Sequence, residues 1–76
     1  MDNFDKLRAI MSKVLRIATD DISIGTSMDT VENWDSLKHM NLVIAIEREF
    51  SIDLDDEEIE ILTNVETILA VIQEKK

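Results

Sequence analysis

Residues 34–50, WDSLKHMNLVIAIEREF, predict a long helix that begins near Leu37 and ends at Phe50. At about 100° per residue, the apolar side chains of this helix fall into two groups. The first group is a stripe wide enough to face a protein core, and it consists of Val43, Ile46 and Phe50, with Leu42 at its margin. The rest of the chain is therefore expected to supply other amphipathic helices that pack against this stripe.

The second group of apolar side chains on this helix, Leu37, Met40 and Ile44, lies about a quarter turn or more from the core stripe. The polar residues interleaved with it are Asn41, Glu47 and Arg48. Either the helix is buried over a wide arc, or this second group stays partly exposed as a docking surface. An apolar patch rimmed by polar residues is typical of an interaction site, and a flexible Met suits a surface that meets several partners.

The segments on either side of this helix predict three further helices. The expected elements are a helix over residues 3–18, a loop over residues 19–35, a short helix over residues 56–62 and a last helix preceded by a capping box at Thr63 and Glu66. Asp55 is the expected cap of the short helix, with Glu58 three residues later. The loop carries apolar residues that we expect to pack across the core, namely Ile22, Ile24, Met28 and Val31. The chain is thus predicted to be a single all-α domain over residues 1–76, a four-helix bundle with a long loop between helices 1 and 2 and a short third helix.

Composition restricts the class of partner. The 76 residues include 17 Asp and Glu but only 8 Lys and Arg, which gives a net charge of −9. An acidic surface of this kind disfavours nucleic acid and anionic lipid, and it favours protein partners that carry basic patches. The chain contains no Cys, starts without the pattern of a signal peptide and has no apolar run long enough to span a bilayer. We therefore expect a monomeric cytoplasmic protein with no membrane insertion.

Ser36 allows two interpretations. A serine in front of an apolar helix is commonly an N-cap, but the neighbouring Asp35 can supply that cap alone. Ser36 can instead be a site of covalent modification, because a phosphate ester there would lie at the positive end of the helix dipole, near amides without intrahelical partners. The stripe that begins at Leu37 would then be the surface by which an enzyme finds the modified serine.

Three other features of the sequence receive structural interpretations. His39 is the single His, and it lies toward the core side of the helix with no third group to orient it, so a hydrolase built on Ser36 and His39 is not expected. The acidic segment that starts at Asp53 lacks the Gly and the Glu that an EF-hand requires at its sixth and twelfth positions, so no metal site of that kind is expected. Trp34 is expected to anchor the long loop against the helices.

Residues 35–37, Asp-Ser-Leu, open a helix that continues as LVIAIEREF at 42–50 and is followed by the acidic stretch IDLDDEE at 52–58. This combination resembles an acyl carrier protein, and the resemblance extends over essentially the whole chain. It implies that Ser36 carries 4′-phosphopantetheine, which a separate phosphopantetheinyl transferase moves from coenzyme A. It implies further that the chain is not an enzyme, but holds acyl groups as thioesters on the prosthetic thiol and presents them to acyl-loading, condensing and acyl-transfer enzymes.

The resemblance also suggests roles for the residues around Ser36. Asp35 and Leu37 match the motif that flanks the modified serine in the family. Met40, Ile44 and Glu47 match positions that the family uses for contact with partners, in agreement with the second stripe. We therefore expect docking of partner enzymes at Leu37, Met40, Asn41, Ile44, Glu47 and Arg48.

Several residues depart from the pattern of fatty-acid carriers. Lys38, Asn41 and Arg48 lie in the turns where those carriers commonly place acids, and Trp34 replaces a small residue. These differences favour a carrier for a specialised pathway. Its cargo is left open among fatty acyl, hydroxyacyl, polyketide, aminoacyl and sugar-modifying acyl groups. The alternative function is an acidic helical interaction module without a prosthetic group, which would not require a serine at position 36.

Overall fold

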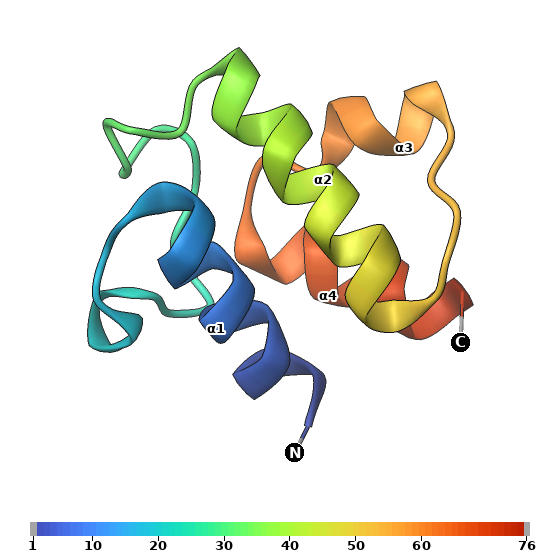
Figure 1. Cartoon of the computed structure of the whole chain (residues 1–76), viewed down its shortest axis with the longest axis horizontal. Helices are drawn as coiled ribbons and strands as arrows, with labels where there is room; N and C mark the ends of the chain where they lie inside the picture. The colour runs from blue at the N-terminus through green and yellow to red at the C-terminus, as the bar shows by residue number, and fades with distance from the viewer. Residues whose placement is uncertain (1, 76) are drawn as a thin grey trace.

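The structure, a computed structural model that describes residues 2–75, contains four α-helices within these residues (Figure 1). They are α1 (Asn3–Leu15), α2 (Ser36–Phe50), α3 (Asp56–Ile61) and α4 (Val65–Lys75), with a short 3₁₀ helix, η1 (Thr19–Asp21), in the long connection between α1 and α2. The prediction of an all-α four-helix fold with a long first loop and a short third helix is confirmed.

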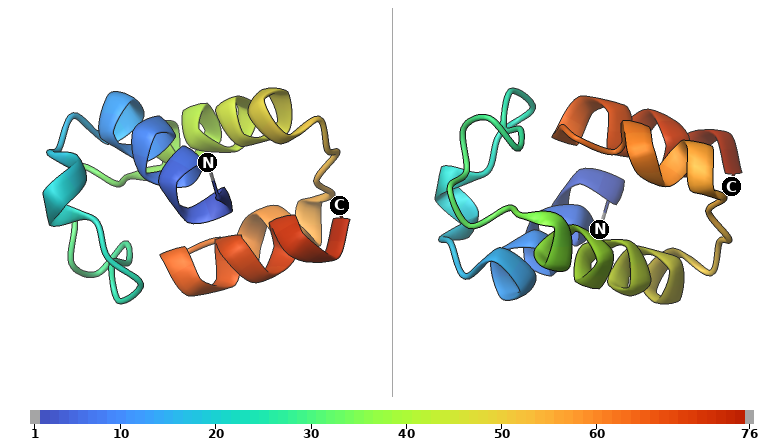
Figure 2. Two further views of the ribbon diagram at one scale, coloured as in Figure 1. Left: turned by 90° about the horizontal axis from the view of Figure 1, so that it is seen from below. Right: turned by 90° about the horizontal axis from the view of Figure 1, so that it is seen from above.

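The helices form two layers around one core (Figure 2). α1 and α2 lie side by side in one layer, and α3 and α4 form the other. Between the layers, the buried side chains of α2 are Leu42, Val43, Ile46 and Phe50. These four residues are the core stripe that the helical periodicity predicts, so α2 turns its predicted apolar face inward.

α1 ends three residues earlier than its sequence pattern indicates. Arg16 adopts a left-handed conformation with φ 57°, and this stops the helix at Leu15. The Leu15 carbonyl oxygen accepts a hydrogen bond from Asn33 Nδ2 at 3.2 Å. The predicted helix over residues 3–18 is therefore wrong at its end, because a residue of the distant loop satisfies a terminal carbonyl that a further helical turn would otherwise have satisfied.

The long loop is tied to the core by most of its apolar side chains. Those buried in the core or packed against it are Ile22, Met28 and Val31. Ile24, by contrast, is 46% exposed, so the expectation that it packs across the core is wrong. Ile24 lies in the middle of a turn closed by a 3.1 Å hydrogen bond from the Thr26 amide to the Ser23 carbonyl, and residues at the corner of such a turn point away from the protein.

α3 begins with the capping box that the sequence predicts. The Asp55 carboxylate accepts a hydrogen bond from the Glu58 amide at 2.8 Å, and the Glu58 carboxylate accepts one from the Asp55 amide at 3.1 Å. The two side chains thus satisfy amides that lack intrahelical partners, which matters for a helix of only six residues.

α4 is capped by a different residue from the one predicted. Asn64 Oδ1 accepts a hydrogen bond from the Thr67 amide at 2.8 Å, so Asn64 is the N-cap and the capping box at Thr63 and Glu66 is wrong. Asn64 also forms an isolated antiparallel bridge with Ser27 of the long loop. This pairing keeps the backbone extended before α4 and moves the helix start one residue beyond the position that the local pattern indicates.

Candidate functional site

Ser36 is the first residue of α2, and its side chain is exposed. The helix cap is supplied by Asp35, whose carboxylate accepts a hydrogen bond from the Lys38 amide at 2.9 Å and whose carbonyl accepts one from the His39 amide at 2.8 Å. Among the described residues, no hydrogen bond of the Ser36 hydroxyl is found. The expectation that Asp35 suffices as the cap is confirmed, and the Ser36 hydroxyl is left available for chemistry.

The backbone around Ser36 suits an anionic group. The amides of Ser36 and Leu37 lie in the first turn of α2, where no preceding helical carbonyl exists to accept their hydrogen bonds. The helix is 15 residues long, so its dipole places partial positive charge at this end. A phosphate esterified to the Ser36 hydroxyl therefore fits the chemistry of this helix terminus.

Trp34 and His39 fix the segment that precedes Ser36. Trp34 is only 3% exposed, and its indole Nε1–H donates to His39 Nδ1 at 3.1 Å. Since an indole nitrogen can only donate, Nδ1 accepts, and the other ring nitrogen, Nε2, donates to the Ile59 carbonyl at 2.7 Å. His39 therefore links the loop before α2 to α3 rather than acting as a base for Ser36, and Trp34 anchors the loop as predicted.

The second stripe of α2 is exposed. Leu37, Met40 and Ile44 are 69%, 45% and 47% exposed, respectively, and we call them the α2 apolar surface. Asn41 and Arg48 are exposed beside it. The helix is therefore not buried over a wide arc, and a contiguous apolar face remains open to contact another molecule.

Glu47 is oriented differently from its neighbours on α2. It is partly buried, and its carboxylate accepts a hydrogen bond from the Leu54 amide at 2.9 Å. Glu47 thereby fixes the connection between α2 and α3, and any contact that it makes with a partner has to share a carboxylate that already serves the fold.

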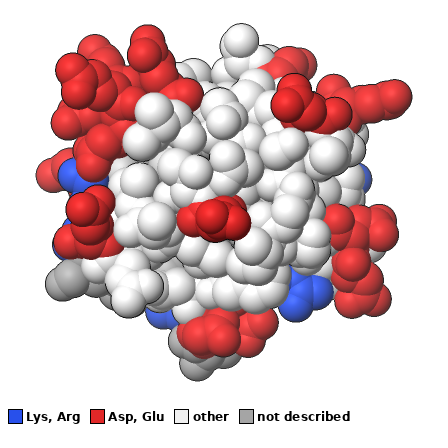
Figure 3. Space-filling view, turned by 180° about the vertical axis from the view of Figure 1, so that it is seen from behind, with Lys and Arg blue, Asp and Glu red and all other residues white. Residues whose placement is uncertain are grey.

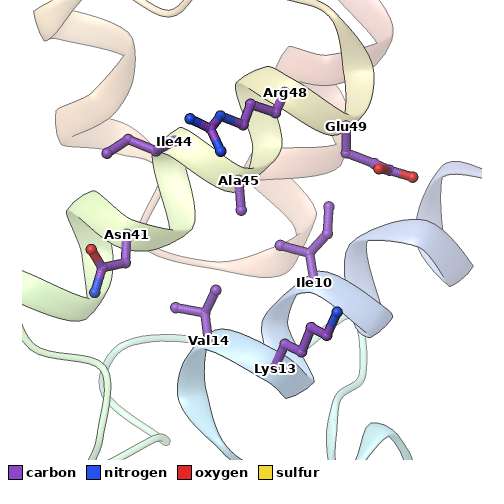
Figure 4. Close-up of a pocket in the computed structure, with 8 residues that line it drawn as sticks. All are labelled: Ile10, Lys13, Val14, Asn41, Ile44, Ala45, Arg48 and Glu49. Atoms are coloured by element: carbon purple, nitrogen blue, oxygen red, sulfur yellow. The ribbon is translucent and has the colours of Figure 1, made fainter.

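A groove of about 410 Å³ lies between α1 and α2 (Figure 4). We call it the α1/α2 groove, and its lining residues are Ile10, Lys13, Val14, Asn41, Ile44, Ala45, Arg48 and Glu49. Three of these residues, Ile10, Lys13 and Val14, come from α1. The sequence does not predict them as site residues, because the periodicity of one helix does not show which other helix packs beside it. The groove borders the α2 apolar surface, since Ile44 belongs to both.

Acidic residues dominate the charge of the molecule. Figure 3 shows most Asp and Glu gathered at the edges of the face opposite to that of Figure 1, around a centre that is uncharged except for one acidic group. At α3, Glu58 and Lys75 form a 2.9 Å ion pair; the hydrogen bond from Lys75 lowers the pKa of Glu58, and the same contact raises the pKa of Lys75. Within the described residues, no group of side chains suited to hold a metal ion is found, and no helix is long and apolar enough to cross a membrane.

Comparison with known proteins assigns this arrangement to a family. A family model for the phosphopantetheine attachment site matches residues 5–72. The chain is 32% identical over 76 residues to the acyl carrier protein of Helicobacter hepaticus, and the match covers all of both chains. The chain belongs to the acyl carrier protein family. It is also 36% identical to the acyl carrier protein of Buchnera aphidicola subsp. Schizaphis graminum, over 99% of this chain and 96% of that relative.

The fold of this carrier matches that of a solved member of the family. The solution structure of holo acyl carrier protein from Geobacter metallireducens superposes with a TM-score of 0.85 at 29% sequence identity, over 99% of this chain and 86% of that one. The chain is accordingly a carrier that takes covalently attached 4′-phosphopantetheine, and it is not an enzyme. The alternative of an interaction module without a prosthetic group is therefore set aside.

Proposed function

We propose that Ser36 is the residue that carries 4′-phosphopantetheine, and that the carrier presents acyl groups to successive enzymes of a biosynthetic pathway. The observation that carries this proposal is the exposed Ser36 hydroxyl at the start of α2, left free because Asp35 makes the helix cap. When attached, the prosthetic group supplies a thiol that holds an acyl group as a thioester.

The neighbouring residues have distinct tasks in this proposal. Asp35 fixes the first turn of α2 through its bond to the Lys38 amide, so the amides of Ser36 and Leu37 stay directed toward the phosphate. Trp34 is held by His39 and stabilises the loop that leads into this turn. The attachment point is therefore presented on a rigid element, while the flexibility needed for delivery belongs to the prosthetic arm.

We further propose that the α2 apolar surface, with Asn41, Glu47 and Arg48 beside it, docks the enzymes that act on the carrier. These are a phosphopantetheinyl transferase and the acyl-loading, condensing and acyl-transfer enzymes of the pathway, whose basic patches would meet the acidic regions of the carrier. Lys38, Asn41 and Arg48 make the exposed side of α2 less acidic, which supports a specialised fatty-acyl, polyketide or related pathway.

Intact-mass spectrometry tests the attachment site. The chain is incubated with coenzyme A, Mg²⁺ and a broad-specificity phosphopantetheinyl transferase, in parallel with the Ser36→Ala variant. We expect a mass gain of one phosphopantetheine group on the native chain and none on the variant.

Ser23→Ala is a matched control for this experiment, because Ser23 is also exposed but lies in the long loop. It should gain the same mass as the native chain. Circular dichroism should show that all three proteins are equally helical, so that a lost mass gain reports chemistry and not unfolding. A mass gain that persists on Ser36→Ala would place the attachment elsewhere.

A substitution on the α2 apolar surface tests docking. We expect Ile44→Arg to lower the kcat/KM of the transferase for the carrier by about tenfold, because a charge replaces an apolar contact on this surface, while the fold is retained. Ile24→Arg is the control, since Ile24 is 46% exposed against 47% for Ile44 but lies on the long loop. Equal transfer kinetics for both variants and the native chain would argue against docking at this surface.

A further inference from the structure

The α1/α2 groove carries positive charge on a protein whose net charge is −9. Lys13 extends from α1, and α2 contributes Arg48 and Glu49, so the lining holds two cations and one carboxylate and is net positive (Figure 4). A second hollow shares Ile10, Lys13 and Glu49 with the groove and reaches as far as Lys6 on α1. Among the described residues, the ion pairs are made by Arg8 and Lys75, and neither Lys13 nor Arg48 takes part in one.

The floor of the groove is apolar. Ile10 and Val14 of α1 and Ala45 of α2 point into the space between the two helices (Figure 4). Ile10 and Val14 are also packed against the core, so this floor is held in place. An apolar floor with Lys13 on one border and Arg48 on the other is complementary to the apolar face of a helix that has acidic side chains on both flanks, although Glu49 offsets part of the charge on the α2 border.

The position of Ser36 on α2 argues against the carried acyl group as the occupant of the α1/α2 groove. At about 100° per residue, the groove-facing side of α2, centred near Asn41 and Ala45, lies roughly 150° around the helix from Ser36. An arm attached to Ser36 thus starts on the opposite side of α2. Ile44 and Arg48, in contrast, join the groove to the α2 apolar surface, so a protein that docks on that surface reaches the groove directly.

We propose that the α1/α2 groove binds an acidic amphipathic helix of a partner protein. This inference rests on the proposed function, because it requires that the carrier binds protein partners. It does not depend on the chemistry of Ser36. The stretch from Lys6 to Val14 extends about 12 Å along α1, enough for two turns of a bound helix. Such a partner would meet the cations of the groove with carboxylates, whereas basic patches would meet the acidic regions elsewhere on the carrier.

NMR titration of the isotope-labelled whole chain tests the proposal, with and without attached phosphopantetheine. The probe is a synthetic helical peptide of about 18 residues, with Leu at i, i+3 and i+4 spacing and Glu on both flanks. The control peptide has Lys in place of each Glu. We expect the acidic peptide to shift the amide signals of Ile10, Val14 and Ala45 in a saturable manner, and to bind at least about tenfold more tightly than the Lys peptide.

Three variants of the chain refine this test. Lys13→Glu combined with Arg48→Glu should weaken binding of the acidic peptide by at least about tenfold, and Glu49→Lys should strengthen it. Arg16→Glu makes the same kind of charge change outside the groove, and it should leave the affinity within about twofold of the native value. If the double variant does not fold, the proposal is tested by the affinities of the other two variants for the acidic peptide. Glu49→Lys should bind it more tightly than the native chain, and Arg16→Glu should not differ from the native chain.

The proposal would be overturned by equal binding of the two peptides, by shifts that map to α3 or the long loop, or by absence of saturable binding. Its failure is separable from that of the attachment proposal. A chain that binds the acidic peptide in the groove but gains no mass at Ser36 contradicts only the attachment site. A chain that is modified at Ser36 but does not distinguish the peptides contradicts only the groove.

Discussion

At the start of α2, two adjacent residues divide the work of capping and of chemistry. The carboxylate and the carbonyl of Asp35 accept the amide hydrogens of Lys38 and His39, respectively. A serine in the capping role would turn its hydroxyl back toward these amides. With Asp35 in that role, Ser36 faces outward, and a bulky group attached to it leaves the helix start unchanged.

His39 gives a prediction about the stability of the fold. His39→Ala removes the acceptor of the buried Trp34 Nε1–H and the donor to the Ile59 carbonyl. Because both groups lose their partners and a cavity is left, we expect the free energy of unfolding to fall by about 2 to 4 kcal/mol. Urea denaturation followed by Trp34 fluorescence measures this change, and the emission of the folded variant should shift to longer wavelength as water reaches the indole.

Asn41→Ala is the control for His39→Ala, because Asn41 lies two residues further along α2 and is exposed. Its effect on the free energy of unfolding should stay below about 0.5 kcal/mol. If His39→Ala were as stable as this control, the link from the loop through His39 to α3 would contribute nothing to the fold.

The predictability of these residues depends on the sequence separation of their contacts. Asp35 caps an amide three residues away, so its role is visible in the sequence alone. The periodicity of α2 also indicates that His39 lies toward the core side. The partner of His39 on α3 is twenty residues distant, and no local pattern relates the two positions. The hydrogen bonds that make His39 structural therefore appear only when the helices are placed in space.

The start of α4 supplies a prediction at the scale of an element. Asn64→Ala should lower the free energy of unfolding by about 1 kcal/mol, because the Thr67 amide loses the side-chain acceptor that caps the helix. Thr63→Ala tests whether Thr63, one residue earlier, is the cap instead. It should lower the free energy of unfolding clearly less than Asn64→Ala does. Chemical denaturation of both variants makes the comparison, and a larger loss for Thr63→Ala would identify Thr63 as the cap after all.

The ion pair between α3 and α4 gives a prediction of pH dependence. The pKa of Glu58 lies below its ordinary value of 4.5, so its contribution to stability is complete above pH 4.5 and is lost as the pH falls through the lowered pKa. The pKa of Lys75 lies above its ordinary value of 10.5, so its contribution is complete below pH 10.5 and is lost as the pH rises through the raised pKa. The pair should therefore stabilise the fold between these two limits.

Glu58→Gln tests this pH window, because Gln keeps an oxygen that can accept from the Asp55 amide but loses the charge that faces Lys75. The Tm of the variant should lie below that of the native chain at pH 7, and the difference should shrink as the pH falls below 4.5. Glu57→Gln is the control, because Glu57 is an exposed neighbour that takes part in none of the ion pairs of the described residues, and it should show no such pH-dependent difference. A difference for Glu58→Gln that is constant with pH would point to a loss of packing instead of charge.

The elements of the fold differ in how far the sequence predicts them. The periodicity of one segment predicts the core stripe of α2 and a second apolar group beside it, and the core stripe is found where it is predicted. The periodicity left open whether the second group is buried, and the structure shows it exposed. The end of α1 depends on Asn33, and the start of α4 depends on pairing with Ser27, so these two boundaries were predicted wrongly. The α1/α2 groove likewise requires two helices that are separate in the sequence, so no local pattern predicts that Lys13 lines it.

At the scale of the whole molecule, the net charge of −9 is opposed by few internal ion pairs. Those recorded within the described residues involve only Arg8 and Lys75 as cations. Most of the carboxylates at the edges of the molecule (Figure 3) therefore have no ion-pair partner among the described residues, and they outnumber the Lys and Arg side chains that lie among them. Repulsion of this kind favours the unfolded chain, in which the charges lie farther apart, and dissolved salt screens it.

The Tm of the carrier should consequently rise as NaCl is increased from about 0.01 M to 0.3 M, a range in which the Debye length falls from roughly 30 Å to less than 8 Å. KCl should act in the same way, because screening does not depend on the identity of the cation. The double variant Glu57→Gln/Glu60→Gln removes two exposed negative charges from α3 and should show a smaller rise. A Tm that falls with added salt would mean that attraction within the few ion pairs outweighs the repulsion among the carboxylates, and that the acidity of this surface does not oppose its folding.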